Sequence, residues 1–365
     1  MKVCIVALHL YPFISQKKTE DKIGGAELQQ AMLAKAFVKN DLEVTVITLD
    51  CGQAKYTEYD GVKVIHTFKE NQGVSGLRFF YPRLYEIIKA LYIADADIYY
   101  VRCAGYLTGV VALFGRLFRK KVVFAAGHDT DFIPGNYLIS LRRDKWLHKI
   151  GLKLVSQIIV QSTQQLKLLQ NNFYKDGMVI RNFSILPVNE VSYKERKTIL
   201  WVSTIRDWKR PMLFLELAKL YPDKSFVMIG GPDVKNNALY EDVKQAAGKL
   251  DNLDFKGFQP IEKTEQYFDQ CAVFVNTSIC EGFPNTFIQA WRRGIPCLSF
   301  FDPDGVIEKF GLGVVADEKE EFFVRLNNAE VMSKKKSKKI IEYYQQNHSE
   351  VVLNTYLSLF KTMLN

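Results

Sequence analysis

Short runs of hydrophobic residues alternate with helix-spaced hydrophobic positions through the first half of the chain. Lys2 to Leu8 is almost continuously apolar, which is typical of a strand buried on both faces of a sheet. Between Leu28 and Phe37 the apolar residues recur at helical spacing instead. The same pattern predicts strands at Val44–Leu49, Lys63–His66, Ile98–Arg102, Val122–Ala125 and Ser156–Gln161, and helices at Leu84–Ala94 and Leu107–Phe118. Repeated strand–helix alternation indicates a doubly wound parallel sheet.

The same rhythm restarts after a polar stretch between Leu186 and Lys197, where we place the linker. The second half contains strand-like runs at Thr198–Val202, Ser225–Ile229, Leu253–Phe255, Val273–Asn276 and Cys297–Phe300, and a helix at Met212–Leu220. We therefore expect an α/β protein with two Rossmann-like, doubly wound parallel-sheet domains, residues 1–188 and 189–340, facing a central cleft. Residues 341–365 belong to a C-terminal helical segment, predicted over Ile340–Leu364, that we expect to pack back on the N-terminal domain.

Composition excludes several protein classes. A chain of 365 residues with 48% hydrophobic and 24% charged residues is an ordinary globular mixture, long enough for two cores. The longest apolar stretch, Ala104–Phe118, is interrupted by Arg116 and is shorter than the roughly 20 residues that span a bilayer. No cleavage site for a secretory signal follows Met1, and the six cysteines form no C-x-x-C pair. We expect a cytoplasmic protein without a disulfide scaffold or a cysteine zinc site.

The net charge of +9 raises the question of an anionic partner. No helix–turn–helix, zinc or RNA-binding signature is present, so nucleic acid is not expected. The run Lys334–Lys339 is typical of a solvated helix face. Two basic and aromatic stretches in the first half, Arg78–Arg83 and Leu141–Lys149, suit an anionic membrane surface and a lipid-linked acceptor. Ordinary surface helices of basic proteins look the same, so peripheral contact with the inner face of the membrane stays one of two interpretations.

Ligands of open α/β sheets bind beyond the carboxyl ends of the strands, so the loops that follow strands carry the candidate chemistry. Gly24 and Gly25 open the first long helix, and adjacent glycines let the backbone approach a phosphate or a sugar closely. A plain helix start explains them equally well. The fingerprint G-x-G-x-x-G does not follow the first strand, which weakens a dehydrogenase interpretation despite Asp50 at the end of the second strand.

The loop after Val122–Ala125 contains a histidine in a position to hydrogen-bond a sugar or a phosphate, His128. Asp129 and Asp131 follow it and offer an alternative, a metal-binding pair for a nucleoside diphosphate. Two short carboxylate side chains after a strand are more often helix caps.

The block from Glu281 to Pro296 is the most informative segment. A strand leads into a turn with Gly282 and Pro284, and a helix begins near Asn285, whose first amides could face a diphosphate. Glu281 would be repelled by a diphosphate, so we expect it to accept hydrogen bonds from sugar hydroxyls instead. Gln289 lies two turns into the helix, where its amide could reach a ribose.

A basic loop follows the first strand of the second half. Arg206 and Lys209 precede a helix that begins near Pro211, and cations there can neutralise a leaving diphosphate. A solvated basic loop would look similar.

Taken together, these residues resemble the retaining glycosyltransferases of family 4, which have the GT-B fold. The resemblance runs in order through Gly24-Gly25-Ala26-Glu27, Val160-Gln161-Ser162, Ile180-Arg181-Asn182, Trp201–Pro211, Phe255-Lys256-Gly257-Phe258 and Glu281–Pro296. It implies a hexosyl transfer from a nucleotide diphosphate sugar to a glycan or lipid-linked acceptor, as in polysaccharide biosynthesis, with retention of configuration and without an obligatory metal or other cofactor.

The resemblance also implies roles for individual residues. The Gly24-Gly25 loop would approach the diphosphate, His128 would contact the donor sugar, and Arg206 and Lys209 would bind the diphosphate. Glu281 would bind sugar hydroxyls. The backbone of the segment Phe283–Thr286, which contains Pro284 and Asn285, would border the sugar and phosphate with its amides. We name His128, Lys209 and Glu281 as catalytic and expect no metal ligand.

Two positions depart from the family pattern. Gln289 stands where the family usually has a second glutamate, and Thr204 stands where it usually has an arginine, a role that Arg206 would assume. These departures keep a catalytically silent nucleotide-sugar-binding protein open as an alternative. A nucleotide-sugar epimerase of similar fold is the alternative among enzymes.

Overall fold

The computed structural model describes residues 1–15, 24–135, 139–188, 195–233, 237–279 and 281–365. The chain forms two compact units: Met1–Arg181 with Val352–Asn365 (unit 1), and Asn182–Val351 (unit 2). The division falls seven residues before the predicted boundary at 188/189, and the chain returns to unit 1 at Val352 rather than at 341. Most of the predicted linker, 189–194, lies outside the described residues, as do residues 16–23 of the first loop.

Unit 1 contains an eight-stranded sheet in the order β3-β4-β2-β1-β5-β6-β7-β8. Its strands are β1 (Lys2–Val6), β2 (Glu43–Thr48), β3 (Tyr56–Tyr59), β4 (Val62–His66), β5 (Ile98–Arg102), β6 (Lys121–Ala125), β7 (Gln157–Val160) and β8 (Met178–Val179). All neighbours pair in parallel except β3, which runs antiparallel to β4 at the edge. The predicted hydrophobic runs form the interior strands because both faces of the sheet are covered by helices.

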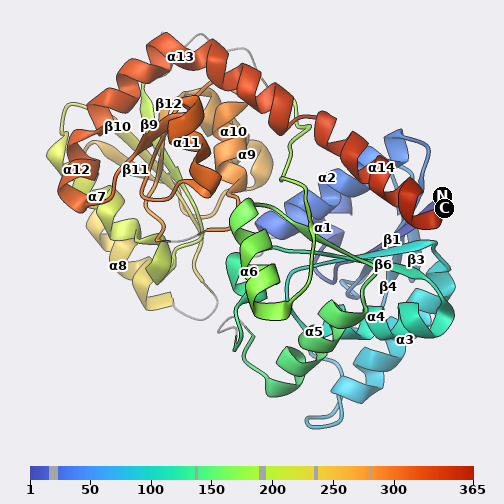
Figure 1. Ribbon diagram of the computed structural model, residues 1–365. Coiled ribbons are helices and arrows are strands. Elements are labelled where there is room, and N and C mark those ends of the chain that lie inside the picture. Colours follow the sequence, from blue (N-terminus) through green and yellow to red (C-terminus); the bar gives the residue numbers. More distant parts are fainter. Residues whose placement is uncertain (16–23, 136–138, 189–194, 234–236, 280) are drawn as a thin grey trace. The chain divides into compact units, whose positions relative to one another are not determined.

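Helices cover the two faces of this sheet (Figure 1). One face carries α3 (Tyr85–Ala94), α4 (Tyr106–Phe118), α5 (Arg142–Leu154) and α6 (Thr163–Phe173), whose apolar sides pack on alternate residues of the strands. The other face carries α1 (Tyr11–Ser15), α2 (Gly25–Lys39) and α14 (Val351–Leu364). On that face, Phe37 of α2 contacts Tyr356 and Phe360 of α14, with ring centroids 6.1 and 5.3 Å apart.

Unit 2 contains a fully parallel six-stranded sheet in the order β11-β10-β9-β12-β13-β14. Its strands are β9 (Thr198–Val202), β10 (Ser225–Ile229), β11 (Leu253–Phe255), β12 (Cys271–Asn276), β13 (Cys297–Ser299) and β14 (Gly313–Val315). Its helices are α7 (Pro211–Leu220), α8 (Asn237–Ala247), α9 (Ile261–Asp269), α10 (Asn285–Trp291), α11 (Val306–Phe310), α12 (Lys319–Val324) and α13 (Leu326–Asn347). Two buried clusters, one on each side of the sheet, form its core.

The C-terminal region differs from its prediction. Instead of one helix from Ile340, α13 begins at Leu326 and ends at Asn347, and α14 begins at Val351 after a break at His348. His348 is fully buried and its Nδ1 lies 2.8 Å from the carbonyl oxygen of Asn182, which fixes this break within unit 2. The described basic side chains of the run 335–339 are exposed on α13, as predicted for a solvated helix face.

No described helix combines the length and the apolar character that a membrane-spanning segment requires.

Candidate functional site

The strand order of unit 2 identifies one edge of its sheet as the ligand-binding edge. Counting strands along the chain, the order is 3-2-1-4-5-6, and it reverses direction between β9 and β12. Ligands of open parallel sheets bind beyond the carboxyl ends of the strands at such a switch point. The loops that leave β9 and β12 carry the predicted residues Lys209 and Glu281.

Lys209 and Glu281 form an ion pair in which Lys209 Nζ donates to Glu281 Oε1. The side chains retain 15% and 13% of their exposure, so the pair lies at the surface but is largely shielded from water. Ser278 Oγ donates to the same carboxylate oxygen at 2.7 Å. The structure thus joins two residues that sequence reasoning assigned to different parts of the ligand.

Hydrogen bonds fasten the two loops to each other. Thr277 Oγ1 accepts from Trp201 Nε1 at 2.9 Å and donates to the carbonyl of Lys209 at 2.5 Å. Arg210 Nε donates to the carbonyl of Thr277 at 2.7 Å, and the amide of Ile279 donates to the carbonyl of Trp208 at 2.9 Å. These contacts hold the backbone beside Lys209 and Glu281 in one arrangement, which favours a preorganised site.

Arg210 is a residue that sequence reasoning missed. It adopts a left-handed backbone conformation (φ 46°) at the start of α7, and its guanidinium lies 4.1 Å from the centroid of the Phe300 ring. In the sequence, only its position between Lys209 and Pro211 indicates that Arg210 belongs to the site. Ser278 and Thr277 were missed as well, because small polar residues after a strand are common in loops.

Arg206 follows an extension of β9, in which the amide of Ile205 donates to the carbonyl of Gly231 at 2.9 Å. Its Nε lies 3.2 Å from a carboxylate oxygen of Asp233, and its guanidinium lies 5.1 Å from the ring centroid of Trp208. An anionic ligand at Arg206 therefore has to compete with a carboxylate that is already in place.

The turn before α10 is mostly buried. Gly282, Phe283 and Pro284 are buried, whereas Asn285 and Thr286 at the start of the helix are half-buried. Asn182 Nδ2 donates to the carbonyl of Phe283 at 2.9 Å and to Asn285 Oδ1 at 3.0 Å. The phenyl ring of Phe283 packs in the core against Trp291, so only the backbone of this turn can face a ligand.

Gln289 is 5% exposed, and its Nε2 donates to Glu265 Oε1 at 2.7 Å. Glu265 belongs to α9, and its other oxygen pairs with Arg292 and, at 2.8 Å, with Arg293. Burial, together with the neighbouring Arg293, lowers the pKa of Arg292 to about 9, so the group still carries its charge at neutral pH. The sequence predicts that the Gln289 amide reaches a ribose. In the structure its nitrogen instead donates to Glu265, which belongs to a group of paired charges that the sequence analysis did not include.

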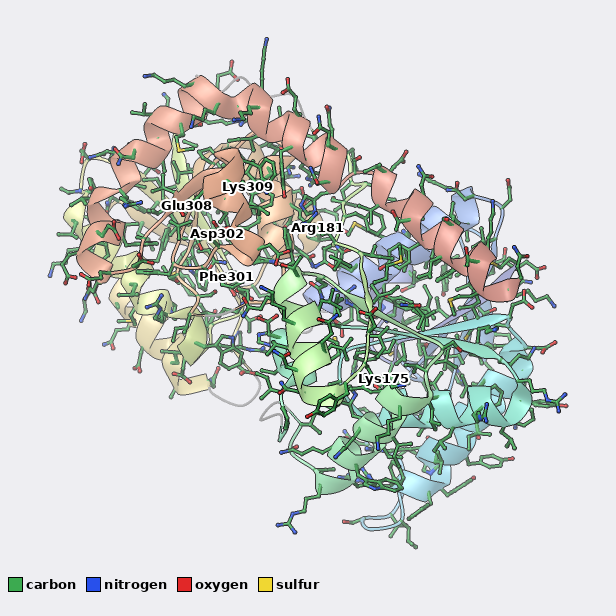
Figure 2. All side chains as sticks on the ribbon, viewed as in Figure 1. Lys175, Arg181, Phe301, Asp302, Glu308 and Lys309 are labelled. Atoms are coloured by element: carbon green, nitrogen blue, oxygen red, sulfur yellow. The ribbon has the colours of Figure 1, made fainter. Side chains whose placement is uncertain are left out.

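A third loop, after β13, borders the same edge of unit 2. Figure 2 labels Phe301, Asp302 and Glu308 on this segment. The two carboxylate oxygens of Asp302 accept from the amides of Ile307 and Glu308 at 2.8 and 3.2 Å, and burial raises the pKa of this carboxyl above its usual value. Asp302 thus caps α11.

In unit 1 the predicted residue His128 occupies the N-cap of a short 3₁₀ helix, Asp129–Phe132. Its Nδ1 accepts from the amide of Thr130 at 3.2 Å, which leaves the proton on Nε2 and makes that nitrogen a donor. Asp131 is 4% exposed, and its Oδ2 accepts from the amides of Gly127 and His128 at 2.7 and 3.2 Å. A Cβ on Gly127 would lie 2.3 Å from Cys103 Sγ, so a glycine is needed there.

These contacts bear on the alternative metal pair. Asp131 caps its own turn, and Asp129 Oδ1 accepts from Gln165 Nε2 at 3.0 Å. Within the described ranges, no group of three or more His, Cys, Asp or Glu side chains is arranged to hold a metal ion.

A pocket of about 330 Å³ lies at the switch point of unit 1, between the carboxyl ends of β1 and β5. Its polar lining includes His9, Glu27, Gln30, Arg102, Tyr106 and Asp144. Gln30 is 4% exposed, and its Nε2 has no hydrogen-bond partner among the described residues. Gly24 caps α2 beside this pocket, and the Glu27 carboxylate occupies the space that a Cβ on Gly24 would take.

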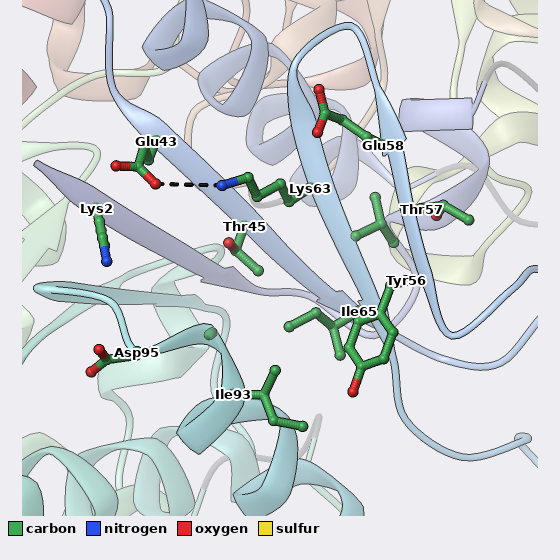
Figure 3. Close-up of a pocket in the computed structure, with 12 residues that line it drawn as sticks. Lys2, Glu43, Thr45, Tyr56, Thr57, Glu58, Lys63, Ile65, Ile93 and Asp95 are labelled. Carbon is green, nitrogen blue, oxygen red and sulfur yellow. Dashed lines mark hydrogen bonds and ion pairs between the residues drawn. The ribbon is translucent and has the colours of Figure 1, made fainter.

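Unit 1 has a further pocket of about 670 Å³ at the opposite, amino ends of β1, β2 and β4 (Figure 3). Its lining mixes cations and carboxylates, and Lys63 Nζ pairs with Glu43 Oε2 at 3.4 Å across the floor. The lining has two lysines and three carboxylates, and none of the predicted site residues lies in it.

Two family models match consecutive parts of the chain. The model described as Glycosyltransferase Family 4 matches residues 23–183, and the model described as Glycosyl transferases group 1 matches residues 183–349. Together they match residues 23–349, which include most of both units, and they meet within two residues of the boundary between the units.

Two curated relatives are similar in sequence. An uncharacterized glycosyltransferase of Haemophilus influenzae is 25% identical over 327 residues, 85% of each chain. The UDP-Gal:alpha-D-GlcNAc-diphosphoundecaprenol alpha-1,3-galactosyltransferase of Escherichia coli is 26% identical over 179 residues, which is 42% of this chain and 45% of the relative.

Solved structures share the fold over the whole chain. Sucrose-phosphate synthase from Thermosynechococcus elongatus superimposes with a TM-score of 0.77 and 16% identity, covering 99% of this chain and 98% of that one. Anabaena HepE in complex with UDP-glucose gives 0.74 and 15%, with 99% of both chains covered. The two Rossmann-like units, the matched family models and these neighbours agree: the chain is a glycosyltransferase of the GT-B fold and belongs to the group 1 glycosyltransferases.

Proposed function

We propose that the protein transfers a hexose from a nucleoside diphosphate sugar to a glycan or lipid-linked acceptor, with retention of anomeric configuration and without a metal ion. The observation that carries the proposal is the Lys209–Glu281 pair at the switch point of unit 2. A cation and a carboxylate held side by side suit a ligand with an anionic diphosphate next to a sugar rich in hydroxyl donors.

The residue roles follow from this pairing. Lys209 would bind the diphosphate, and Glu281 would accept hydrogen bonds from sugar hydroxyls while keeping the lysine in place. Arg206 would add a second cation after exchanging Asp233 for phosphate oxygens. The backbone amides before α10 would border the phosphate. The Nε2–H group of His128 would donate a hydrogen bond to a sugar hydroxyl.

Transfer would proceed by front-face substitution at the anomeric carbon, without a covalent bond between the sugar and the protein. The bond from this carbon to the phosphate oxygen breaks, and the acceptor hydroxyl oxygen bonds to the carbon on the same face. The hydroxyl proton passes to the departing phosphate oxygen. Lys209 and Arg206 stabilise the negative charge that develops on the diphosphate, the step in which fixed cations contribute most.

The acceptor would occupy the 330 Å³ pocket of unit 1. Carboxylates such as Glu27 and Asp144 accept from sugar hydroxyls, and Gln30 Nε2 can donate to one. The name of the Escherichia coli relative describes a diphosphate-lipid acceptor, and HepE was solved in complex with UDP-glucose. Both support a UDP-sugar donor and a lipid-linked glycan acceptor for this chain.

A thermal-shift panel tests the donor site. UDP, GDP, ADP, NAD and the matching nucleotide sugars are added with and without a chelator, because a ligand that binds only the folded protein raises Tm with its occupancy. We expect UDP to raise Tm more than the other nucleotides do, by an amount that the chelator does not change. A rise with NAD alone, or one abolished by the chelator, would refute the proposal.

Turnover and stereochemistry need a separate measurement. Release of free sugar from the preferred donor separates an enzyme from a silent binding protein, which would show affinity without turnover. Proton NMR of the first product reports the anomeric configuration. An inverted product would overturn the retaining mechanism while leaving the donor site intact.

A further inference from the structure

Three neighbouring helices of unit 1 carry exposed stripes on the side that faces away from the sheet. On α3 and the turn before it, Tyr81, Tyr85, Ile88 and Tyr92 recur at helical spacing and are 41–67% exposed. The spacing of Tyr85, Ile88 and Tyr92 places them on one face of α3, away from the buried Ile87 and Leu91. Tyr81 precedes the helix, and its ring lies 5.8 Å from that of Tyr85. Large apolar side chains that gather on a surface generally mark an interaction site. The row of exposed tyrosines is therefore a candidate for one.

The stripe continues onto α4 and α5. Leu113 and Leu117 of α4 are 45% and 76% exposed, and the Tyr92 ring lies 6.0 Å from that of Phe118, which connects α3 with α4. On α5 the exposed stripe is basic with one aromatic member: it consists of Arg142, Trp146, Lys149 and Lys153. The three helices cover the same face of the sheet, so their outer sides form one surface (Figure 1).

The charge of this surface has one sign. The exposed charged residues of the three helices are all cations: Lys89 on α3, Arg116 on α4, and Arg142, Arg143, Lys149 and Lys153 on α5. The acidic residues of the three helices are half-buried and paired: Glu86 with Lys55 at 3.4 Å, and Asp144 with Arg143 at 2.8 Å. Just after α3, the exposed Asp95 is paired with Lys120 at 2.7 Å.

From these observations we propose that the outer side of α3, α4 and α5 (the docking face: Tyr81, Tyr85, Ile88, Tyr92, Leu113, Leu117, Arg142, Trp146, Lys149 and Lys153) binds an anionic lipid bilayer. Tyrosine and tryptophan place an apolar ring in the headgroup region and keep a polar end in water, while lysines and arginines attract acidic headgroups. The proposal rests on the lipid-linked acceptor of the proposed function, because binding to a bilayer would bring unit 1 to the surface where such acceptors reside.

A second copy of this chain fits the docking face less well. A symmetric contact would bring the cations of α5 close to their own copies, and the described residues of the face include no exposed, unpaired carboxylate to neutralise them. A bilayer with acidic headgroups supplies that negative charge.

Vesicle co-sedimentation of the full chain without substrate tests the proposal. One set of vesicles is pure phosphatidylcholine and the other an equal mixture of phosphatidylcholine and phosphatidylglycerol. We expect binding to the mixed vesicles only, and loss of binding at high salt. Lys149→Glu with Lys153→Glu should weaken it about tenfold or more, because each cation near an acidic membrane contributes substantially to affinity.

The matched control reverses two lysines at the same spacing on α13 of unit 2, Lys335→Glu with Lys339→Glu, which changes the net charge equally. A second pair of variants tests the apolar part: Tyr92→Ser with Leu117→Ser should also weaken binding, whereas Leu220→Ser with Val324→Ser, exposed positions of unit 2, should not. Melting curves of all variants verify that they fold.

Equal loss in variant and control, or equal binding to both kinds of vesicle, would overturn the proposal. So would a wild-type dimer, detected by sedimentation velocity, that the docking-face variants dissociate, since the partner would then be protein. The thermal shift with nucleotides is measured on the same variants and should be unchanged. Failure of vesicle binding is thereby distinguished from failure of the donor site.

Discussion

At the scale of single residues, the ion pair of Lys209 and Glu281 is where catalysis and stability are easiest to separate. We expect Lys209→Ala and Glu281→Ala each to lower the rate of transfer about 100-fold or more, because each removes a group to which the proposed function assigns a role in the transition state. Each single variant should also melt below the wild type, since it leaves a shielded charge without its partner. Steady-state kinetics and melting curves measure both effects.

The double variant Lys209→Ala with Glu281→Ala is the control. Removing both charges should restore much of the lost melting temperature, because no unpaired charge remains, but should not restore activity. A double variant that regained transfer would mean that the pair is structural and that the catalytic assignment is wrong.

Gln289 gives a second prediction at this scale. Gln289→Glu would place a carboxylate at hydrogen-bond distance from Glu265, and repulsion should raise the pKa of the pair in the folded protein above the value of about 4.3 in the unfolded chain. Below about 4.3 the folded and unfolded states both hold the proton, so the variant should match the wild type most closely there. As pH rises from this value to the raised folded-state pKa, the unfolded chain loses its proton first and the variant loses stability. We expect a deficit of about 1–3 kcal/mol at neutral pH.

Urea unfolding at several pH values measures this deficit. Gln289→Met, similar in length but uncharged, should lose the hydrogen bond without adding a pH dependence. A Gln289→Glu variant as stable as wild type at neutral pH would show that Glu265 can move away, and it would leave a carboxylate at this position compatible with the fold.

At the scale of elements, His148 connects α5 with the loop that carries His128. Its Nε2 lies 2.9 Å from the carbonyl of Asp131, and its Nδ1 lies 3.3 Å from Thr108 Oγ1 on α4. Burial lowers the pKa of His148 below 6.5. Because the folded state resists protonation, the protein should lose stability as pH falls below about 6.5, where the unfolded chain binds the proton.

His148→Gln removes the titrating group and should flatten this loss between pH 7.5 and 5.5, values that bracket the unfolded pKa of about 6.5. Unfolding free energies from urea titrations provide the comparison. Parallel slopes for His148→Gln and wild type would show that His148 does not titrate in this range.

Most elements could be predicted from the sequence because parallel strands covered on both faces are continuous apolar runs, such as Ile98–Arg102 and Thr198–Val202. The edge strand β3, in which two tyrosines enclose Thr57 and Glu58, had no such signal. The break at His348 was invisible as well, because it depends on a bond to Asn182, 166 residues away. Local patterns do not report partners that distant.

The candidate site divides in the same way. Lys209 and Glu281 could be selected because each follows a strand, and the strand order that makes β9 and β12 neighbours brings them together. The partners of Gln289 and Arg206 could not be selected, since Glu265 and Asp233 belong to other elements and resemble ordinary surface carboxylates in the sequence.

At the scale of the whole molecule, the chain builds unit 1 from both of its ends. After completing unit 2, it returns with α14, and Tyr356 and Phe360 enter the core beside Phe37 and Tyr100. Unit 1 is therefore complete only when the last fourteen residues are in place, although the sequence between them and Arg181 belongs to unit 2.

Phe360→Ala tests this dependence. Phe360 is fully buried, and removing a buried phenyl ring costs about 3–5 kcal/mol. Because the ring packs on α2, the loss should fall on unit 1: hydrogen exchange measured by mass spectrometry should accelerate in peptides of β1 and α2 and stay near wild type in those of β9 and β12. Phe214→Ala, which empties an equally buried position in the core of unit 2, should give the reverse pattern. If both variants accelerated exchange evenly over the two units, the units would unfold as one cooperative structure, and α14 would stabilise the whole chain rather than the unit that it completes.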